Sequence, residues 1–179
     1  MLSLQYRMHP DISRFPSTTF YQSQLCDGDG MALSTAQAWH KSSLFPPYAF
    51  FHVRDGKERA NSHSYVNDIE VATAIALYER LVREFPMARN MLIGVLSPYK
   101  SQVALLRDQF RRRVPESALA NIAFNTVDGF QGQEKDVIIL SCVRGGAADK
   151  TVGFLADTRC VGLPAVMLDT RSSDYHAVA

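Results

Sequence analysis

Two short polar stretches, far apart in the sequence, carry residue types that suit a nucleotide site. Residues 5–10 read QYRMHP, so that Gln5, Tyr6 and Arg7 bring an amide, an aromatic ring and a guanidinium together. Residues 126–136 read TVDGFQGQEKD and form a polar, glycine-bearing stretch. The guanidinium of arginine is a planar, permanently charged fork that matches phosphate oxygens. We therefore interpret the two stretches as one wall of a nucleotide site.

Each stretch leads directly into an element that can position it. Pro10 suits the first turn of a helix, where its missing N–H costs nothing, and Pro16 is expected to interrupt that helix. The second stretch runs into an apolar, strand-like segment at residues 137–143. Because one stretch precedes a helix and the other precedes a strand, both can converge on a single edge of a sheet.

The rest of the sequence alternates between strand-like and helix-like segments. Asn67 can cap a helix, with Glu70 three residues later as in a capping box, and residues 101–113 suit a further helix. The strand-like segments are residues 48–53, 91–96, 122–125 and 137–143. Residues 54–64 are expected to form a charged loop. Evenly apolar strands that alternate with helices predict an α/β fold, a parallel sheet with helices on both faces.

The composition is that of a folded domain and limits where nucleic acid could bind. Hydrophobic residues make up 46% of the chain and charged residues 21%, as in soluble globular proteins. Because the net charge is only +1, any nucleic-acid surface must be a local patch. The one dense cationic run is three arginines at residues 111–113, and it is either a solvated helix end or a phosphate contact.

Several other functional classes are not expected. The three cysteines are odd in number and widely spaced, which argues against a disulfide framework, and Cys142 has the surroundings of a small core residue. The scattered histidines and cysteines predict no metal site. No apolar run is long enough to span a membrane, and the N-terminus lacks the zones of a signal peptide. We therefore expect an intracellular protein with no membrane partner.

Three blocks of the sequence resemble the second RecA-like domain of superfamily 1 helicases, in the group that contains the nonsense-mediated-decay helicase and senataxin. The blocks are residues 5–10, 93–102 and 125–136, and residues 143–144 and 153–157 also fit. They follow the order of the family, and the senataxin-like branch looks closest. The resemblance implies a RecA-like fold of the P-loop NTPase type, with ATP and Mg²⁺ as cofactors. It also implies 5′-to-3′ unwinding of RNA, DNA or RNA–DNA hybrids.

The resemblance implies an ATP-binding role for five residues: Gln5, Tyr6, Arg7, Gly132 and Glu134. Tyr6 would stack on the base, with Gln5 supporting the loop beside it. Arg7 would be the catalytic residue, an arginine finger that reaches the γ-phosphate during phosphoryl transfer. Glu134 would meet the ribose hydroxyls, and Gly132 would let the backbone approach the phosphates. The alternative for Arg7 is a structural salt bridge at a helix end.

A second set of residues falls at the carboxyl ends of two predicted strands, where parallel sheets bind their ligands. In the family that the sequence resembles, these positions contact a single strand of nucleic acid, which assigns that role to Ser97, Pro98, Tyr99, Lys100, Asn125 and Thr126. Hydroxyl and backbone N–H groups contact phosphates without reading bases, so we expect sequence-independent, salt-sensitive binding of single-stranded RNA or DNA. A Ser-Pro-Tyr turn is also an ordinary loop.

The sequence contains no Gly-x-x-x-x-Gly-Lys-Ser/Thr phosphate loop. In the family, that loop and the acidic residues that hold Mg²⁺ belong to the first RecA-like domain. We therefore expect this chain to be a fragment whose partner is that first domain, and we expect it not to hydrolyse ATP alone. Residues 1–159 are predicted to form the RecA-like domain, and residues 160–179 a tail that departs from the family pattern, as after a frameshift, a mis-spliced exon or a truncated gene model.

Two functions from different classes remain open. The first is the second motor domain of an ATP-dependent RNA or DNA helicase, which supplies half of a composite ATP site. The alternative is a non-catalytic module that binds single-stranded nucleic acid. The senataxin-like resemblance implies a nuclear location, and the sister branch a cytoplasmic one.

Overall fold

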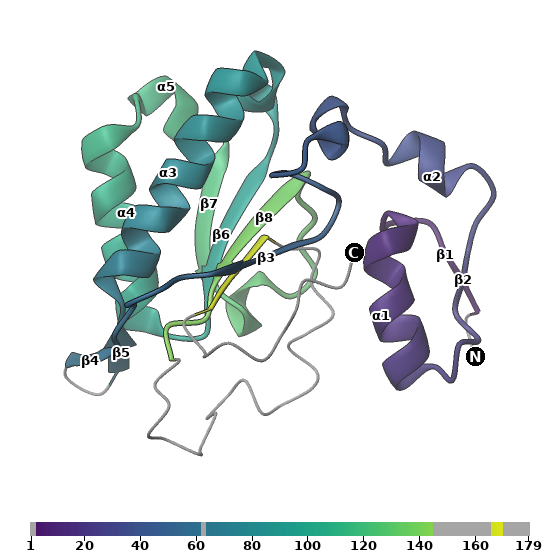
Figure 1. Ribbon diagram of the computed structural model, residues 1–179, viewed down its shortest axis with the longest axis horizontal. Coiled ribbons are helices and arrows are strands. Elements are labelled where there is room, and N and C mark those ends of the chain that lie inside the picture. The colour runs from purple at the N-terminus through teal and green to yellow at the C-terminus, as the bar shows by residue number, and fades with distance from the viewer. Residues whose placement is uncertain (1–2, 62–63, 145–165, 170–179) are drawn as a thin grey trace.

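The centre of the molecule is a five-stranded sheet in which every neighbouring pair of strands is parallel. The computed structural model describes residues 3–61, 64–144 and 166–169 of the 179-residue chain. The strands are β3 (Ala49–His52), β6 (Ile93–Ser97), β7 (Ile122–Thr126), β8 (Val137–Ser141) and β9 (Val166–Asp169). Their order across the sheet is β3-β9-β8-β6-β7 (Figure 1). The predicted α/β fold, a parallel sheet flanked by helices, is confirmed.

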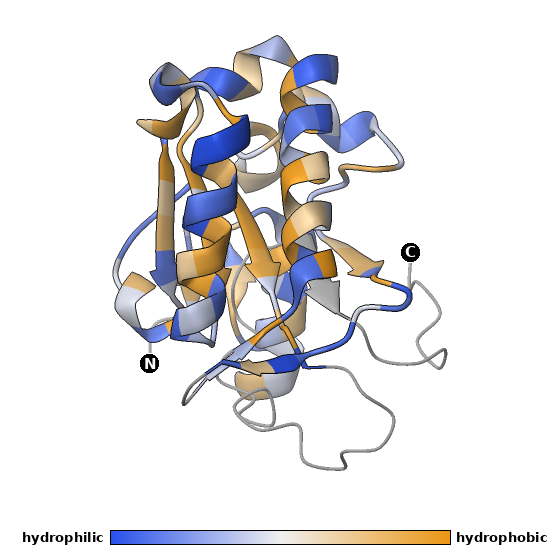
Figure 2. Ribbon diagram, turned by 90° about the vertical axis from the view of Figure 1, so that its left-hand side faces the viewer, coloured by the Kyte–Doolittle hydropathy of each residue, from blue (hydrophilic) through white to orange (hydrophobic). Residues whose placement is uncertain are grey.

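Two long helices cover one face of the sheet. Helices α3 (Asp68–Glu84) and α4 (Lys100–Arg113) bury their apolar stripes against it. Tyr78 of α3 and Phe110 of α4 pack in the same cluster as Val95 of β6. In Figure 2 the strands are orange between helices whose outward sides are largely blue. The short elements η2 (Pro86–Asn90) and α5 (Glu116–Leu119) complete this layer.

The other face carries a smaller apolar cluster that belongs to the polar loop before β8. Phe130, in the 3-10 helix η3 (Asp128–Phe130), packs with Leu96, Leu140 and Cys142. Cys142 is fully buried, as predicted for a small core residue. Phe130 thus anchors the loop that carries Gly132 and Glu134 to the sheet.

Four residues of the segment predicted to depart from the family pattern lie inside the sheet. Strand β9 pairs with β8, with Ile139 opposite Val166, and with β3, with Ala49 opposite Val166. This segment therefore contributes an inner strand. The boundary of the RecA-like domain at residue 159 stays a prediction.

The N-terminal elements form a separate group beside the sheet, to its right in Figure 1. Strand β1 (Leu4–Gln5) pairs in parallel with β2 (Cys26–Asp27). Helix α1 (Pro10–Phe20) follows β1, and the group continues into α2 (Met31–Ser34) and η1 (Ala38–Lys41).

Helix α1 does not stop at Pro16, so the predicted interruption is wrong. A proline inside a helix removes one backbone hydrogen bond. Here Pro16 and Ser17 are buried, and the Ser17 hydroxyl donates to the carbonyl of Leu25 at 2.8 Å. Packing and this tertiary hydrogen bond offset the loss, which the local sequence alone cannot indicate.

The predicted charged loop at residues 54–64 contains regular structure that the sequence analysis missed. Strands β4 (Arg59–Asn61) and β5 (Ser64–Val66) pair antiparallel, and β5 packs on α4. The Arg59 guanidinium donates to both carboxylate oxygens of Asp68, at 2.8 and 3.2 Å. The hairpin is thereby attached to the first turn of α3.

Candidate functional site

Gln5 shapes the loop that presents Tyr6 and Arg7. Its side-chain carbonyl accepts from the backbone N–H groups of Arg7 (2.9 Å) and Met8 (2.7 Å). Its amide nitrogen donates to the Met8 carbonyl at 2.8 Å and to the Asp27 carboxylate at 2.5 Å. Because the oxygen and the nitrogen of this buried amide both form hydrogen bonds with the loop backbone, Gln5 is positioned to support the loop. The sequence analysis did not single out Asp27, whose carboxylate also accepts from Ser13 at 2.6 Å.

The Tyr6 ring is exposed, and it lies directly over Gly28. Tyr6 is 69% exposed, so one face of its ring is available to a ligand. A β-carbon at position 28 would overlap atoms of the Tyr6 ring. Gly28 therefore sets how closely the ring approaches β2. The sequence analysis did not connect Gly28 with Tyr6.

Arg7 and Glu134 meet, as the convergence of their two stretches predicts. Arg7 Nη2 lies 2.5 Å from Glu134 Oε1, and both side chains are about two-thirds exposed, at 66% and 65%. Arg7 therefore does make a salt bridge, the alternative role considered for it, but this one joins two loops; its role at a phosphate stays a prediction. Exposed ion pairs contribute only about 0–1 kcal/mol to stability. Both groups can therefore change partners at little cost.

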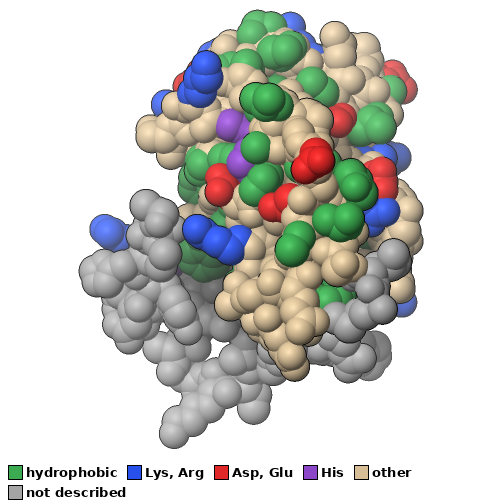
Figure 3. All heavy atoms as spheres, turned by 90° about the vertical axis from the view of Figure 1, so that its right-hand side faces the viewer, with side chains coloured by type: hydrophobic (Ala, Val, Ile, Leu, Met, Phe, Trp, Pro, Cys, Tyr) green, Lys and Arg blue, Asp and Glu red, His purple; other side chains and the backbone are tan. Residues whose placement is uncertain are grey.

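A cavity of about 430 Å³ lies behind this ion pair. It is lined by the exposed Arg7 and Glu134 and by the buried Trp39, Phe45 and Ile139. Tyr6 does not line it, so a base stacked on Tyr6 would sit outside the cavity. Figure 3 shows this side of the molecule, where histidine, acidic and basic side chains gather.

Two histidines line the same cavity and contact each other edge to face. The ring centroids of His9 and His40 are 5.3 Å apart. His9 accepts from the Asp11 backbone N–H at 3.2 Å, and His40 accepts from that of Gln37 at 3.2 Å. Burial and then the neighbouring His9 lower the pKa of His40, and Asp11 acts in the opposite direction. The packing therefore favours the neutral form of His40.

Gly132 occupies a backbone conformation that favours glycine. Its φ is +84°, and a β-carbon there would meet nothing within 4 Å. The position therefore needs glycine for the turn itself, whatever approaches the exposed loop. Glu134 follows two residues later, and the loop ends where Leu92 N donates to the Asp136 carboxylate at 2.7 Å.

The residues predicted to bind nucleic acid are brought together at the opposite edge of the sheet. Parallel pairing of β6 with β7 places Ser97 beside Thr126 and Leu96 beside Asn125. The side chains shape their own turns: Ser97 Oγ accepts from Tyr99 N at 3.3 Å, and Asn125 Nδ2 donates to Gly129 O at 2.8 Å.

This edge offers exposed and half-buried groups to a ligand. Lys100, in the first turn of α4, is exposed, and Pro98 and Tyr99 are half-buried. Thr126 Oγ1 accepts from Gly129 N at 3.2 Å, which leaves its hydroxyl hydrogen directed elsewhere. The cationic run at residues 111–113 lies in the last turn of α4, where Arg112 pairs with Asp108 at 2.9 Å.

An aromatic and charged cluster supports Tyr99, and the sequence analysis missed it. The rings of Tyr65 and Tyr99 meet edge to face with centroids 5.7 Å apart. The Arg144 guanidinium lies 4.9 Å from the Tyr65 ring centroid, and Arg144 Nε lies 3.3 Å from Glu58 Oε1. Burial raises the pKa of the Tyr99 hydroxyl, and the nearby Arg144 opposes this shift. No sequence signal joined these four residues, because they come from three separate segments: the region of the β4–β5 hairpin, the turn after β6 and the turn after β8.

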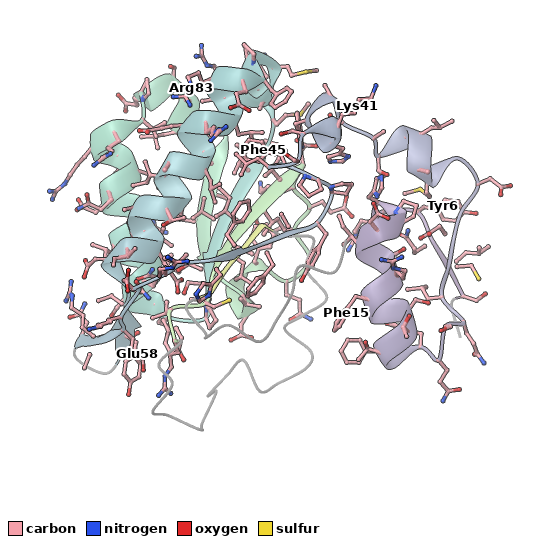
Figure 4. All side chains as sticks on the ribbon, in the orientation of Figure 1. Tyr6, Phe15, Lys41, Phe45, Glu58 and Arg83 are labelled. Atoms are coloured by element: carbon pink, nitrogen blue, oxygen red, sulfur yellow. The ribbon has the colours of Figure 1, made fainter. Side chains whose placement is uncertain are left out.

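The two predicted sites therefore lie at opposite edges of one sheet. The loop with Glu134 precedes β8, whereas Ser97 and Thr126 end β6 and β7. In Figure 4, Tyr6 and Glu58 lie on opposite sides of the molecule. Within the described residues, no group of three or more histidine, cysteine or acidic side chains could hold a metal ion. In the same part of the chain, no helix is long and apolar enough to cross a membrane.

Comparisons with known proteins identify the family of the chain. A family model described as "AAA domain" matches residues 1–168. "Helicase sen1" of Schizosaccharomyces pombe is 47% identical over 161 residues, which cover 89% of this chain and 9% of that protein. "Helicase SEN1" of Saccharomyces cerevisiae is 43% identical over 163 residues, or 89% of this chain and 7% of that protein. "Probable helicase senataxin" of Homo sapiens is 33% identical over 156 residues, or 87% and 6%.

The chain belongs to this AAA domain family, as a superfamily 1 helicase domain of the senataxin-like branch. The family predicted from the three sequence blocks is thereby confirmed. The chain spans less than a tenth of the length of these three relatives.

Proposed function

We propose that this chain is the second motor domain of an ATP-dependent helicase that moves 5′ to 3′ along RNA or DNA. Its relatives named helicases support this, as does the arrangement of its two predicted sites. The ATP site is composite. This chain contributes Tyr6, Arg7, Gly132 and Glu134, with Gln5 as the support of the loop, and a first RecA-like domain contributes the phosphate loop.

The observation that carries the proposal is the exposed pair of Arg7 and Glu134. Both side chains extend from separate loops to one point, 2.5 Å apart, and remain largely exposed. On arrival of a nucleotide, Arg7 would leave the carboxylate for the phosphates, and Glu134 would accept hydrogen bonds from ribose hydroxyls. A bidentate guanidinium–phosphate contact is stronger than an exposed ion pair, so this exchange is favourable.

The residues of this chain fit one half of an ATP and Mg²⁺ site. Tyr6 offers an exposed ring, and Arg7 offers a fork of donors on the same rigid loop. Mg²⁺ would neutralise charge on the phosphates, from ligands in the first domain. Arg7 would stabilise the negative charge that develops on the transferred phosphoryl group, which is the role of an arginine finger.

Single-stranded nucleic acid would bind at the other edge of the sheet. Pro98, Tyr99 and Lys100 would contact one part of the sugar-phosphate backbone, and Asn125 and Thr126 the next. Ser97, which is completely buried, would act by shaping the turn through its hydrogen bond with Tyr99 N. Pairing of β6 with β7 supports one continuous surface. A helicase of the senataxin-like branch would act in the nucleus, and fluorescence imaging of the tagged full-length protein tests that location.

A chimera tests the proposal. Residues 4–144 of this chain replace the matching segment of fission yeast sen1, and unwinding of a 5′-tailed duplex is measured with ATP. We expect unwinding that Arg7→Ala abolishes. A chimera that folds and binds the single strand, yet gives no unwinding in any variant, would favour the alternative of a non-catalytic binding module. The matched control is Arg14→Ala, because Arg14 is an exposed arginine of α1 outside the predicted site.

A further inference from the structure

Val143 has a backbone conformation that a branched side chain rarely adopts. Its φ is +69°, and it is completely buried directly after β8. Left-handed backbone costs an L-residue about 1–2 kcal/mol, and a β-branched residue in this region is an outlier. Strain of this kind persists only where the surrounding structure enforces it. Something in the fold must therefore hold Val143 in place.

Two buried side chains at the start of α3 form hydrogen bonds with the backbone N–H and the carbonyl of Val143. The Glu70 carboxylate accepts from Val143 N at 2.9 Å, and Asn67 Nδ2 donates to Val143 O at 3.0 Å. Both side chains are completely buried. Asn67 also caps α3, because its Oδ1 accepts from Glu70 N at 3.2 Å.

Glu70 does not complete the predicted capping box, because its carboxylate does not accept a hydrogen bond from the backbone N–H of Asn67. Its carboxylate instead accepts from the Ser141 hydroxyl at 2.6 Å. Gln102, in the first turn of α4, takes the place next to Asn67. It accepts from Asn67 N at 2.9 Å and donates to Asn67 O at 3.1 Å and Ser141 Oγ at 2.9 Å. We call Asn67, Glu70, Gln102 and Ser141 the polar clamp.

The residue after the strained position is Arg144. The left-handed turn at Val143 directs the chain so that the Arg144 side chain reaches the Tyr65 ring and Glu58. The same guanidinium lies next to Tyr99, which we propose to contact nucleic acid. A relaxed backbone at Val143 would turn Arg144 away from this cluster.

We propose that the polar clamp holds Val143 in its left-handed conformation and thereby positions Arg144, which in turn positions Tyr99 at the nucleic-acid edge of the sheet. This assigns Asn67 and Glu70 as positioning residues that act through Arg144. The clamp also ties the first turn of α4, with the neighbouring Lys100, to the same end of β8. The proposal rests on the proposed function only where it concerns nucleic acid.

The position of Arg144 can be measured without a ligand. In the full chain, the Arg144 Nε–H proton is expected to show an upfield NMR shift from the Tyr65 ring, assigned by its loss in Arg144→Ala. We expect Glu70→Gln to lose this shift, because an amide cannot accept from Val143, Ser141 and Asn67 together. Asn67→Ser is the milder variant, because serine keeps the helix cap and loses only the amide donor to Val143 O and Glu70 Oε1. If both variants fold and keep the shift, the inference is wrong.

A rescue experiment separates positioning from general stability. Glu70→Gln is combined with Val143→Gly, which adopts positive φ freely, and with Val143→Ala, which also loses the side chain but does not relieve the strain. We expect the Arg144 shift to return with glycine and not with alanine. If the Arg144 shift is the same in the glycine and alanine double variants, the proposal is contradicted. A network that only stabilises the fold gives no reason for glycine alone to restore the shift.

Binding of a fluorescent 12-mer of oligouridine then tests whether the position of Arg144 affects nucleic-acid binding. We expect Glu70→Gln to weaken binding about ten-fold, as for one lost contact, and to add nothing further in an Arg144→Ala background. Additive losses would overturn the link through Arg144. If the wild-type chain shows the Arg144 shift and binds no oligonucleotide, the proposed nucleic-acid function fails, while the NMR result still decides the positioning.

Discussion

At the residue scale, the contact of Tyr6 with Gly28 would limit how a base stacks at the proposed nucleotide site. Because a β-carbon at position 28 would overlap the Tyr6 ring, Gly28→Ala must displace the ring. We expect the chimera with sen1 to show a higher KM for ATP and a nearly unchanged kcat, since stacking is equal in the ground and transition states. Steady-state ATP hydrolysis measures both.

The control for this prediction is the same substitution in a Tyr6→Ala background. Without the ring, Gly28→Ala has nothing to displace, so its effect on KM should vanish. A full effect of Gly28→Ala in that background would show that the glycine acts in some other way.

His40 gives the N-terminal group a pH dependence. Its pKa lies below the ordinary value of 6.5, chiefly through burial. The unfolded chain therefore takes up a proton first as pH falls, and stability is lost from about pH 6.5 downward. We expect the free energy of unfolding to fall as pH drops below about 6.5, by at most about 1.4 kcal/mol per pH unit. The loss stops once pH is below the lowered folded pKa, where His40 is protonated in both states.

Urea unfolding of wild type and His40→Asn measures this effect. Asparagine can keep the acceptor for Gln37 N but does not titrate in this range, so the slope with pH should decrease. An identical slope in both proteins would assign the dependence to other groups.

At the scale of elements, the start of α3 should dominate the stability of the helix layer. Asn67 is completely buried, and five hydrogen bonds join its side chain and backbone to Glu70, Gln102 and Val143. We expect Asn67→Ala to lower the free energy of unfolding by about 2–4 kcal/mol, from the lost cap and the unsatisfied groups left behind. Chemical denaturation provides the measurement.

Arg59→Ala is the matched comparison, because Arg59 contacts the same helix turn from the surface. Its pair with Asp68 is more than half exposed on both sides, and such pairs contribute about 0–1 kcal/mol. A larger loss for Arg59→Ala than for Asn67→Ala would contradict the view that the buried contacts control this helix start.

The elements were predictable where one local pattern dominates. Periodicity and the cap at Asn67 predicted α3, and the evenly apolar runs predicted β3, β6, β7 and β8. The hairpin β4–β5 and the passage of α1 through Pro16 were missed, because both depend on contacts with segments distant in sequence. Glu70 shows the same limit: its spacing from Asn67 fits a capping box, but its carboxylate is used by Ser141 and Val143.

The candidate site was also predictable from the sequence only in part. The positions of the two stretches, one before a helix and one before a strand, predicted that they can converge, and the ion pair of Arg7 with Glu134 confirms it. Gly28 belongs to no motif, and the fit of residues 143–144 to the family pattern did not indicate which residues Arg144 would contact. Only the pairing of β1 with β2, and the turn after β8, bring them to their places.

At the scale of the whole molecule, β8 joins the two edges of the sheet. It begins next to the loop that carries Glu134 and ends two residues before the strained Val143. Since the proposed ATP and nucleic-acid sites lie at opposite ends of this strand, their residues should act separately in the isolated chain.

Oligonucleotide binding by the isolated chain tests this separation. We expect Arg7→Ala to leave the Kd unchanged, and Lys100→Ala to weaken binding and reduce the salt slope by about 0.7, the value for one phosphate contact on a single strand. Fluorescence anisotropy over a range of salt concentrations measures both. An equal loss in the two variants would mean that the two edges are not separate sites.

The most direct test of the account is the rate of ATP hydrolysis by the sen1 chimera carrying Arg7→Lys at saturating ATP. Lysine keeps the charge and can pair with Glu134, but it lacks the planar fork. If Arg7 is an arginine finger, kcat should fall by a factor of about 10³ or more with little change in KM. Activity close to that of the unmodified chimera would show that Arg7 acts only as the partner of Glu134, and it would contradict the motor role proposed for this chain.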